Sequence, residues 1–303
     1  MLRNRSFGLV LATSMTASMA VLAQNAASPK PRQLEANGTD LTFVDQGKGA
    51  PIVFVHGAVG DLRFWEPQRA AFAKNHRYVA YTLRYHGTGV WPDAGKQYGT
   101  DVHSADLAAF ISALKAGPVH LVGLSYGGLL AALVATRDPS LVRSLTLAEP
   151  ALFELLADRP EDKQVLDAWA KAIGPMMEPL KAGDSVTATK RLVGVVNGSF
   201  GGDFDSLPAD LRQILLDNAR TLPLLFASPS KPVPCDTLRA LKVPTLLIHG
   251  EHTPVFFSRI TEAVGRCVTS SQKVVIPKAS HTMSAQNPAA FNDAILSFVE
   301  KHR

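Results

Sequence analysis

The sequence predicts an α/β protein with a doubly wound, mostly parallel β-sheet and a helical insertion. Short continuous apolar runs, such as residues 51–55 and 119–124, are typical of strands buried on both faces of a parallel sheet. Helical patterns follow most of these runs after short links, as they do in doubly wound folds. Between residues 150 and 234 the apolar runs give way to helical segments broken by Gly and Pro.

The first half of the chain alternates between strands and helices. Strands are expected at residues 41–45, 51–55, 78–83, 119–124 and 141–148. Helices are expected at residues 64–74, 101–115 and 126–137. The helix over residues 101–115 has Thr100 as its candidate N-cap and Gly117-Pro118 as its stop.

The second half contains the insertion and then returns to the alternating pattern. Helical segments of the insertion are expected at residues 151–157, 161–173, 186–196 and 207–216. After it, strands are expected at residues 244–250 and 273–277, and helices at residues 255–267 and 288–301. The expected division is a core of residues 24–149 and 235–303 and a helical cap of residues 150–234.

Residues 1–23 have the order of a secretory signal peptide. Arg3 and Arg5 precede an apolar stretch that is too short and too rich in small residues for a good membrane span. We therefore expect a cleaved signal and a periplasmic or secreted protein with no stable membrane anchor. A retained N-terminal anchor is the alternative, but no positively charged stop-transfer segment follows.

Charge and cysteine content narrow the expected partners. The 303-residue chain is 46% hydrophobic with a net charge of +5, and its Lys and Arg residues are scattered, which argues against nucleic acid. The two cysteines, Cys235 and Cys267, are expected to form a disulfide in an exported protein, with two separate buried thiols as the alternative. No Cys/His spacing resembles a zinc site, so neither a metal nor another cofactor is expected.

Ser125 is a candidate nucleophile, because Gly123-Leu124-Ser125-Tyr126-Gly127 lies between a predicted strand and a predicted helix. A sharp turn at such a junction lifts the serine hydroxyl clear of the sheet. The hydroxyl needs a base to accept its proton, and His281 follows the last predicted strand, at the edge of the sheet where such folds bind ligands. Among the other histidines, His103 and His252 are expected to be exposed.

These features resemble the α/β-hydrolase fold superfamily. The resemblance covers the chain from about Leu41 to the C-terminus, and it is carried by His56-Gly57, Arg84-Tyr85-His86-Gly87, Gly123 to Gly128 and Ile276 to His281. It implies a serine hydrolase that cleaves carboxylic esters or lactones through an acyl-enzyme. It also implies a cap after the sixth strand and an oxyanion hole made by the backbone N–H groups of Ala58 and Tyr126.

The catalytic acid departs from the family's pattern. The family commonly places Asp three residues after the glycine that ends the penultimate strand, where this chain has Thr253, and threonine cannot stabilise an imidazolium. Two carboxylates remain at strand ends, Glu149 and Glu251. Some family members take the acid from the position of Glu149, so a Ser125-His281-Glu149 triad is favoured and Glu251 stays open.

Other functions share this set of residues. C–C bond hydrolases and cofactor-free haloperoxidases of the same fold use a Ser-His-acid set, and a ligand-binding protein could keep the fold without turnover. The substrate itself does not follow from fold similarity, beyond a small molecule. Six apolar residues are candidates for shaping the pocket, although each is also typical of ordinary core: Trp65, Phe153, Met176, Met177, Phe226 and Met283.

Overall fold

The structure is a computed structural model that describes residues 29–157, 159–228 and 232–303. The expected signal peptide, residues 1–23, lies outside the described residues. In the part of the chain that is described, no helix has the length and apolar character needed to cross a bilayer.

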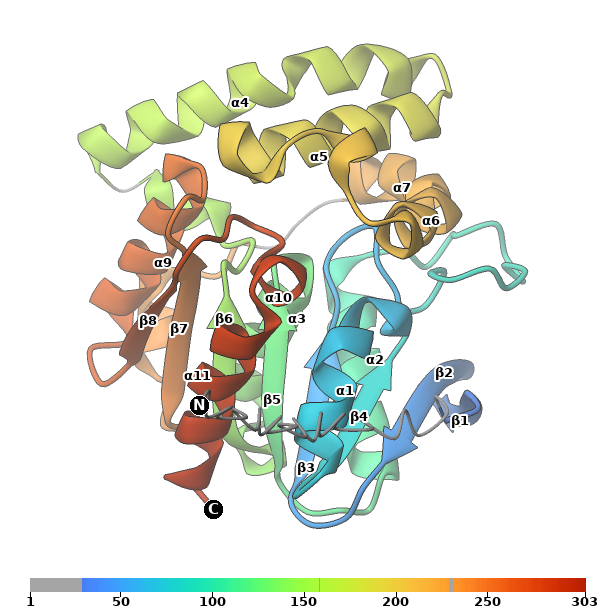
Figure 1. Cartoon of the computed structure of the whole chain (residues 1–303), viewed down its shortest axis with the longest axis vertical. Helices are drawn as coiled ribbons and strands as arrows, with labels where there is room; N and C mark the ends of the chain where they lie inside the picture. Colours follow the sequence, from blue (N-terminus) through green and yellow to red (C-terminus); the bar gives the residue numbers. More distant parts are fainter. Residues whose placement is uncertain (1–28, 158, 229–231) are drawn as a thin grey trace, which may run out of the picture.

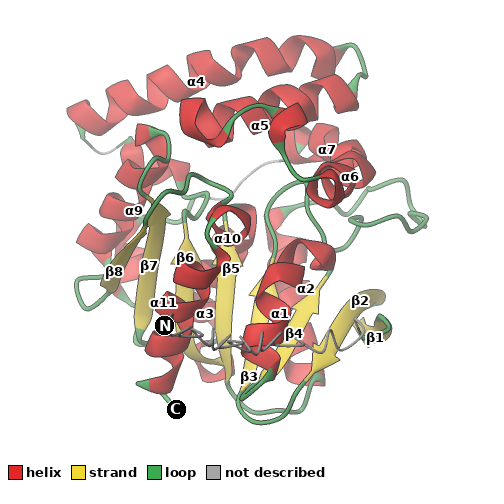
Figure 2. Ribbon diagram, viewed as in Figure 1, coloured by secondary structure: helices red, strands yellow, loops and turns green. Residues whose placement is uncertain are grey.

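An eight-stranded sheet in the order β1-β2-β4-β3-β5-β6-β7-β8 forms the centre of the molecule (Figures 1 and 2). Its strands are β1 (Arg32–Ala36), β2 (Thr39–Gln46), β3 (Pro51–Val55), β4 (Arg77–Tyr81), β5 (Val119–Leu124), β6 (Val142–Ala148), β7 (Thr245–Gly250) and β8 (Gln272–Ile276). β2 runs antiparallel to β1 and to β4, and all other neighbours are parallel. The predicted doubly wound α/β class is confirmed.

Helices cover both faces of the sheet. They are α1 (Glu66–Ala73), α2 (Thr100–Ala113), α3 (Tyr126–Arg137), α8 (Cys235–Arg239), α9 (Val255–Cys267), α10 (Met283–Gln286) and α11 (Pro288–Glu300). Helix α1 packs with α10 and α11 on one face, and α2, α8 and α9 lie with α3 on the other. Each face has its own hydrophobic core, because side chains alternate along a strand. Ile52 and Phe54 of β3 point to the core under α1 and α11, and Val53 and Val55 point to the core under α3 and α9.

Strand β1 and the N-cap of α2 differ from the sequence-based expectations. Strand β1 was not predicted, because its five residues are mostly exposed and lack an alternating apolar pattern. Thr100 is not the N-cap of α2 but its first residue, and Gly99 is the cap, since the Gly99 carbonyl already accepts a hydrogen bond from the His103 N–H at 2.9 Å.

Four helices form a cap over the end of the sheet to which the strand arrows point: α4 (Pro160–Lys181), α5 (Ser185–Gly201), α6 (Ala209–Asn218) and α7 (Leu222–Ala227) (Figure 1). Short 3₁₀ helices are η1 (Leu62–Trp65), η2 (Pro139–Leu141), η3 (Phe153–Leu156), η4 (Phe204–Ser206) and η5 (Ala219–Thr221). Helix α4 continues past residue 173, where the expected helical segment ends, because Met176 and Leu180 bury an apolar stripe on that side.

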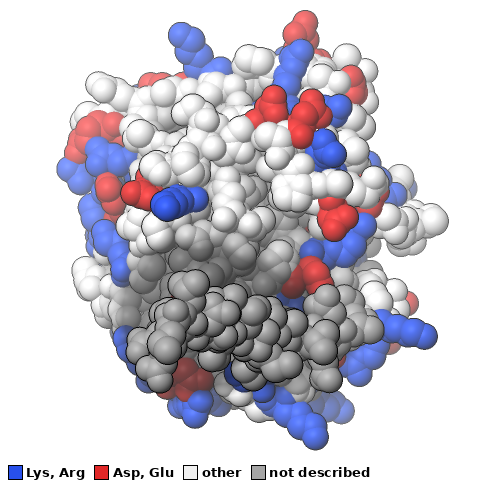
Figure 3. Space-filling model, viewed as in Figure 1, with Lys and Arg blue, Asp and Glu red and all other residues white. Residues whose placement is uncertain are grey.

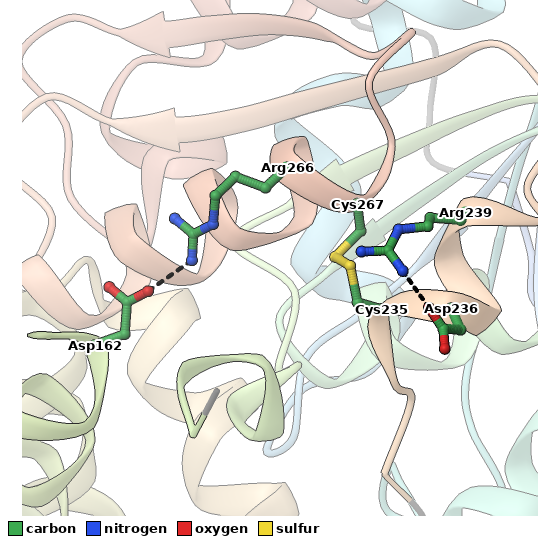
Figure 4. Close-up of a disulfide and its surroundings, with 6 residues drawn as sticks. All are labelled: Asp162, Cys235, Asp236, Arg239, Arg266 and Cys267. Carbon is green, nitrogen blue, oxygen red and sulfur yellow. Dashed lines mark hydrogen bonds and ion pairs between the residues drawn. A yellow bond between two sulfur atoms is a disulfide. The ribbon is translucent and has the colours of Figure 1, made fainter. Parts of the chain in front are cut away.

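Two of the polar contacts that attach the cap to the core involve a buried carboxylate. At one of them, the carboxylate of Asp162 in the first turn of α4 is 1% exposed and pairs with Arg259 of α9 at 3.2 Å. It also pairs with Arg266 of α9 at 2.6 Å (Figure 4). At the other, buried Asn218 donates to an Asp61 carboxylate oxygen at 2.7 Å and accepts the Gly87 N–H at 2.6 Å.

The disulfide predicted from the two cysteines is present in the structure. Cys235 at the start of α8 is bonded to Cys267 at the end of α9, with an S–S distance of 2.11 Å (Figure 4). The bond ties the segment that returns from the cap to the outer face of the core. On the face shown in Figure 3, acidic and basic side chains are interspersed over the described surface.

Candidate active site

Ser125 lies at the turn between β5 and α3 in a strained backbone conformation. Its φ of 54° falls in the left-handed region, which residues other than glycine rarely adopt. A Cβ on Gly123 would lie 2.4 Å from the Gly127 carbonyl oxygen, and a Cβ on Gly127 would lie 2.3 Å from the Val55 carbonyl oxygen. The glycines are therefore needed for the close packing of this turn, and the Ser125 N–H is held by the Ala148 carbonyl at 3.0 Å.

His281 and Glu149 form a buried pair. The imidazole Nδ1 lies 2.5 Å from Glu149 Oε2, and the carboxylate is fully buried. The second oxygen, Oε1, accepts the Gly250 N–H at 2.9 Å. Because an ionised carboxylate only accepts hydrogen bonds, Nδ1 must carry the proton, and Nε2 is left with a free lone pair. The Phe257 ring stacks on the imidazole at a centroid distance of 4.0 Å and fixes its plane.

Glu251 is directed elsewhere. Its side chain is about half exposed, and its Oε2 accepts the backbone N–H of Lys278 at 2.8 Å. Thr253, which stands where the family's acid is common, has a buried Oγ1 for which no hydrogen-bond partner is found among the described residues. Of the two candidate acids, the structure therefore brings Glu149 and not Glu251 to His281.

The two residues expected to form the oxyanion hole lie beside the serine. Ala58 follows β3, Tyr126 begins α3, and both line the same cavity as Ser125 and His281. The loop that carries Ala58 is braced from behind, since the Ala58 carbonyl oxygen lies 2.8 Å from His86 Nε2 and 3.3 Å from Thr221 Oγ1.

Three buried histidines lie behind this loop. His56 donates from Nδ1 to the Gly57 carbonyl at 2.8 Å, and its Nε2 accepts the Leu83 N–H at 3.0 Å. Burial, with the nearby His86 second, lowers the pKa of His56 to about 3. Burial likewise lowers the pKa of His103 well below its ordinary value. Burial also lowers the pKa of His86, so all three rings, His56, His86 and His103, are neutral at pH 7.

The expectation that His103 is exposed is wrong. The side chain is fully buried, and its Nδ1 lies 2.9 Å from the Tyr126 hydroxyl, because α2 packs on α3 beside the active-site turn. His252 is exposed, as expected, and its ring stacks on Phe200 at 4.0 Å.

A cavity of about 370 Å³ lies between the cap and Ser125. Of the six apolar candidates, Phe153 and Phe226 line it. Trp65, Met176 and Met283 are instead fully buried in the core, and Met177 packs against that core, because their side chains face the interior of the sheet and cap layers. The described lining is mostly aliphatic and aromatic, and it contains no Lys, Arg, Asp or Glu.

The polar residues of this lining that the sequence-based analysis missed include Asn197 of α5 and Tyr98. Asn197 lies next to Gly198, and such a pair inside a helical pattern is the one signal that could have identified a break there. In the described ranges, no group of three or more His, Cys, Asp or Glu side chains is arranged to hold a metal ion.

Comparison with known proteins gives consistent matches. A family model described as the alpha/beta hydrolase fold matches residues 50–288. A non-heme haloperoxidase of Rhodococcus erythropolis is 27% identical over 281 residues, which cover 88% of this chain and 97% of that protein. A 2-hydroxy-6-oxo-6-(2'-aminophenyl)hexa-2,4-dienoic acid hydrolase of Metapseudomonas resinovorans is 24% identical, with 89% and 91% covered. Among solved structures, a thermophilic esterase from Thermogutta terrifontis superposes with a TM-score of 0.73 at 24% identity, covering 90% of this chain and all of that one.

Proposed function

Because this chain belongs to the α/β-hydrolase fold family, we propose that it hydrolyses carboxylic esters or lactones with Ser125 as the nucleophile, His281 as the base and Glu149 as the acid. The observation that carries the proposal is the buried 2.5 Å contact between His281 Nδ1 and Glu149, at a cavity that Ser125 also lines. A histidine held in this tautomer can accept a proton at Nε2, which a serine nucleophile requires.

The proposed reaction has two halves. Ser125 Oγ attacks the ester carbonyl as its proton passes to His281 Nε2, and the N–H groups of Ala58 and Tyr126 stabilise the oxyanion. His281 then protonates the leaving alkoxide, which leaves an acyl-enzyme. Water then attacks the acyl carbonyl as its proton passes to His281 Nε2. The bond between Ser125 Oγ and the acyl carbon breaks, His281 returns the proton to Ser125 Oγ, and the carboxylic acid product is released. The negative charge of Glu149 stabilises the imidazolium in both halves.

The cavity favours a neutral substrate. Its lining among the described residues contains no Lys or Arg, and a substrate carboxylate placed there would lose its hydration without gaining a positively charged partner. The dienoic acid named for one relative is an anion at neutral pH, so the lining supports ester or lactone hydrolysis over the C–C bond hydrolase alternative. Cofactor-free haloperoxidase activity is the other alternative, and a halogenation assay of the purified protein would measure it.

Export from the cytoplasm is part of the proposal. It rests on the signal-like order of residues 1–23 and is supported by the disulfide between Cys235 and Cys267, since disulfides persist in oxidising compartments. N-terminal sequencing of protein taken from the periplasm or medium should begin near residue 24. A mature protein that starts at Met1 in a membrane fraction would favour the retained anchor.

The test of function is covalent labelling together with turnover. A fluorophosphonate probe should label the wild type on Ser125, and Ser125→Ala and His281→Ala should each reduce ester turnover to background while leaving the protein folded. The double variant should be no worse than either single variant, because nucleophile and base act as a unit. An active Ser125→Ala enzyme would overturn the proposal, and a folded wild type that neither labels nor turns over any ester or lactone would favour the ligand-binding alternative.

A further inference from the structure

One amide group in the cavity lacks a hydrogen-bond partner. Asn197 lies on α5 of the cap, is fully buried, and lines the cavity opposite the core. For its Nδ2 no partner is found among the described residues. A buried amide donor without a partner costs free energy, so such a group in a substrate cavity points to a ligand that supplies an acceptor.

The orientation of this amide is set by its other end. Asn197 Oδ1 accepts from Ser280 Oγ at 3.2 Å and from Thr282 Oγ1 at 3.1 Å. Ser280 Oγ accepts from Gln286 Nε2 at 3.0 Å, while Gln286 Oε1 accepts the Ser280 N–H at 2.6 Å. The Ser280 hydroxyl proton then has two acceptors within reach, Gln286 Oε1 at 3.1 Å and Asn197 Oδ1 at 3.2 Å, and the Thr282 hydroxyl donates to Asn197 Oδ1 as well. With Oδ1 facing two hydroxyl donors, Nδ2 is the end left for the cavity.

The local backbone is built to place Asn197 there. Gly198 has a φ of 60° and breaks the helical conformation of α5 directly after Asn197. A Cβ on Gly201 would lie 2.4 Å from Asn197 Cβ and 2.5 Å from Ser280 Oγ, so a glycine is needed at this position for cap and core to meet. The site is therefore a specific contact between the cap and the loop that carries His281.

The position of the amide determines which part of the substrate it can reach. Ser280 and Thr282 flank His281, so Asn197 lies on the histidine side of the cavity, where the base must protonate the departing alkoxide. The other unpartnered polar group of the lining, the Tyr98 hydroxyl, belongs to a ring that packs against His103 at 4.6 Å, behind the Tyr126 side of the site. The amide thus faces the alcohol part of an ester.

We infer that Asn197 is a specificity-determining residue, whose Nδ2 donates a hydrogen bond to an oxygen acceptor in the alcohol part of the substrate. This inference rests on the proposed ester hydrolase function. It assigns the enzyme to esters of neutral, oxygen-bearing alcohols, such as glycol or glycol-ether esters, in preference to esters of simple alkanols.

The test compares three esters of equal length and shape. Pentyl hexanoate, 2-ethoxyethyl hexanoate and 3-methoxypropyl hexanoate differ only in whether an ether oxygen replaces a methylene, and all release hexanoate, so one pH-stat assay serves all three. The quantity measured is kcat/KM for each ether ester divided by that for pentyl hexanoate. Comparing this ratio between variants cancels the intrinsic reactivity of the esters.

Three variants separate recognition from packing. Asn197→Leu removes the amide at similar volume, and Asn197→Asp, assayed at pH 8, keeps acceptors for Ser280 and Thr282 but removes the donor. Thr189→Val is the matched control, because Thr189 is on the same helix, is fully buried with no partner found for Oγ1 among the described residues, and does not line the cavity.

We expect the ratio for at least one ether ester to fall about tenfold in both Asn197 variants and to stay at the wild-type value in Thr189→Val. Equal ratios in the wild type and in either folded, active Asn197 variant would overturn the inference while leaving ester hydrolysis intact. Absence of turnover of all three esters by the wild type, with no fluorophosphonate labelling, would instead be a failure of the proposed function.

Discussion

Replacement of Glu149 by Gln tests the least conventional part of the site. Glu149 Oε1 accepts the Gly250 N–H at 2.9 Å, and Oε2 faces His281 Nδ1 at 2.5 Å. A glutamine of the same shape would keep its carbonyl oxygen toward Gly250, because the reverse orientation sets an NH₂ group against an N–H and costs about 1–3 kcal/mol. The NH₂ group would then face Nδ1, which must accept, and the imidazole proton would move to Nε2.

The magnitude follows from these two effects. An orientation penalty of about 1–3 kcal/mol leaves roughly one molecule in 5 to one in 150 with the tautomer that can accept the serine proton. Loss of the carboxylate charge beside the imidazolium adds to this, and changes of this type in serine hydrolases cost about 10⁴-fold in kcat. We therefore expect Glu149→Gln to lower kcat by about 10³- to 10⁴-fold, or about 4–5 kcal/mol of transition-state stabilisation.

The assay is steady-state ester hydrolysis at pH 8, with circular dichroism and thermal unfolding to establish that each variant is folded. Glu251→Gln is the matched control, since the Glu251 side chain is about half exposed. Its Oε2 accepts the Lys278 N–H and lies 3.6 Å from His252 Nε2, away from His281. Its kcat should fall by less than about tenfold. A loss below tenfold in folded Glu149→Gln would refute the reasoning, and a larger loss in Glu251→Gln would identify that residue as the acid.

Three further predictions concern stability and the cap. Thiol titration of denatured wild type should find no free thiol, and the Cys235→Ser/Cys267→Ser double variant should lose about 3–4 kcal/mol of unfolding free energy, measured by urea titration; two titratable thiols would contradict the disulfide. Burial, as the main cause, and the nearby Arg143, as the second, lower the pKa of His120 to about 4. Between pH 6.5 and 4 the unfolded chain therefore binds a proton that the folded chain does not, and the free energy of unfolding decreases as the pH is lowered. His120→Gln should therefore show a shallower fall of Tm over that range, and an unchanged profile would mean that His120 does not contribute. Gly201→Ala should lower kcat/KM by about tenfold or more with a modest change in Tm, since its Cβ displaces Asn197, and an unaffected kcat/KM would show that the contact can adjust.

The parts of the site that the sequence could predict are those whose chemistry dictates their place in the chain. A nucleophilic serine needs a tight turn with small neighbours, and a base must follow another parallel strand to reach the same edge, so Ser125 and His281 could be proposed from local pattern. Glu149 could be proposed because it ends the strand beside the serine. The choice between Glu149 and Glu251 depends on side-chain direction, which only the tertiary structure gives.

The remaining features depend on contacts between distant segments. Asn197 matters because it meets Ser280 and Thr282, which lie 83 and 85 positions further along the chain, and no local pattern encodes that meeting. His103 was expected to be exposed because its burial requires α2 to pack on α3. Strand β1 was missed since pairing with β2, and not an apolar pattern of its own, makes it a strand.

The two attachments of the cap that involve a buried carboxylate limit how this protein can be recombined with its relatives. The residues that hold the cap are divided between the exchanged and the retained parts: Asp162 and Asn218 would leave with the cap, while Asp61, Arg259 and Arg266 would stay behind. A cap moved by cutting at the two junctions would leave the buried Asp162 carboxylate without its two arginines, at a cost of about 3–5 kcal/mol. The retained Asp61 would lose the hydrogen bond from Asn218 and keep its ion pair with Arg63. Transfer of substrate preference by exchange of caps therefore requires both halves of each attachment to be transplanted together.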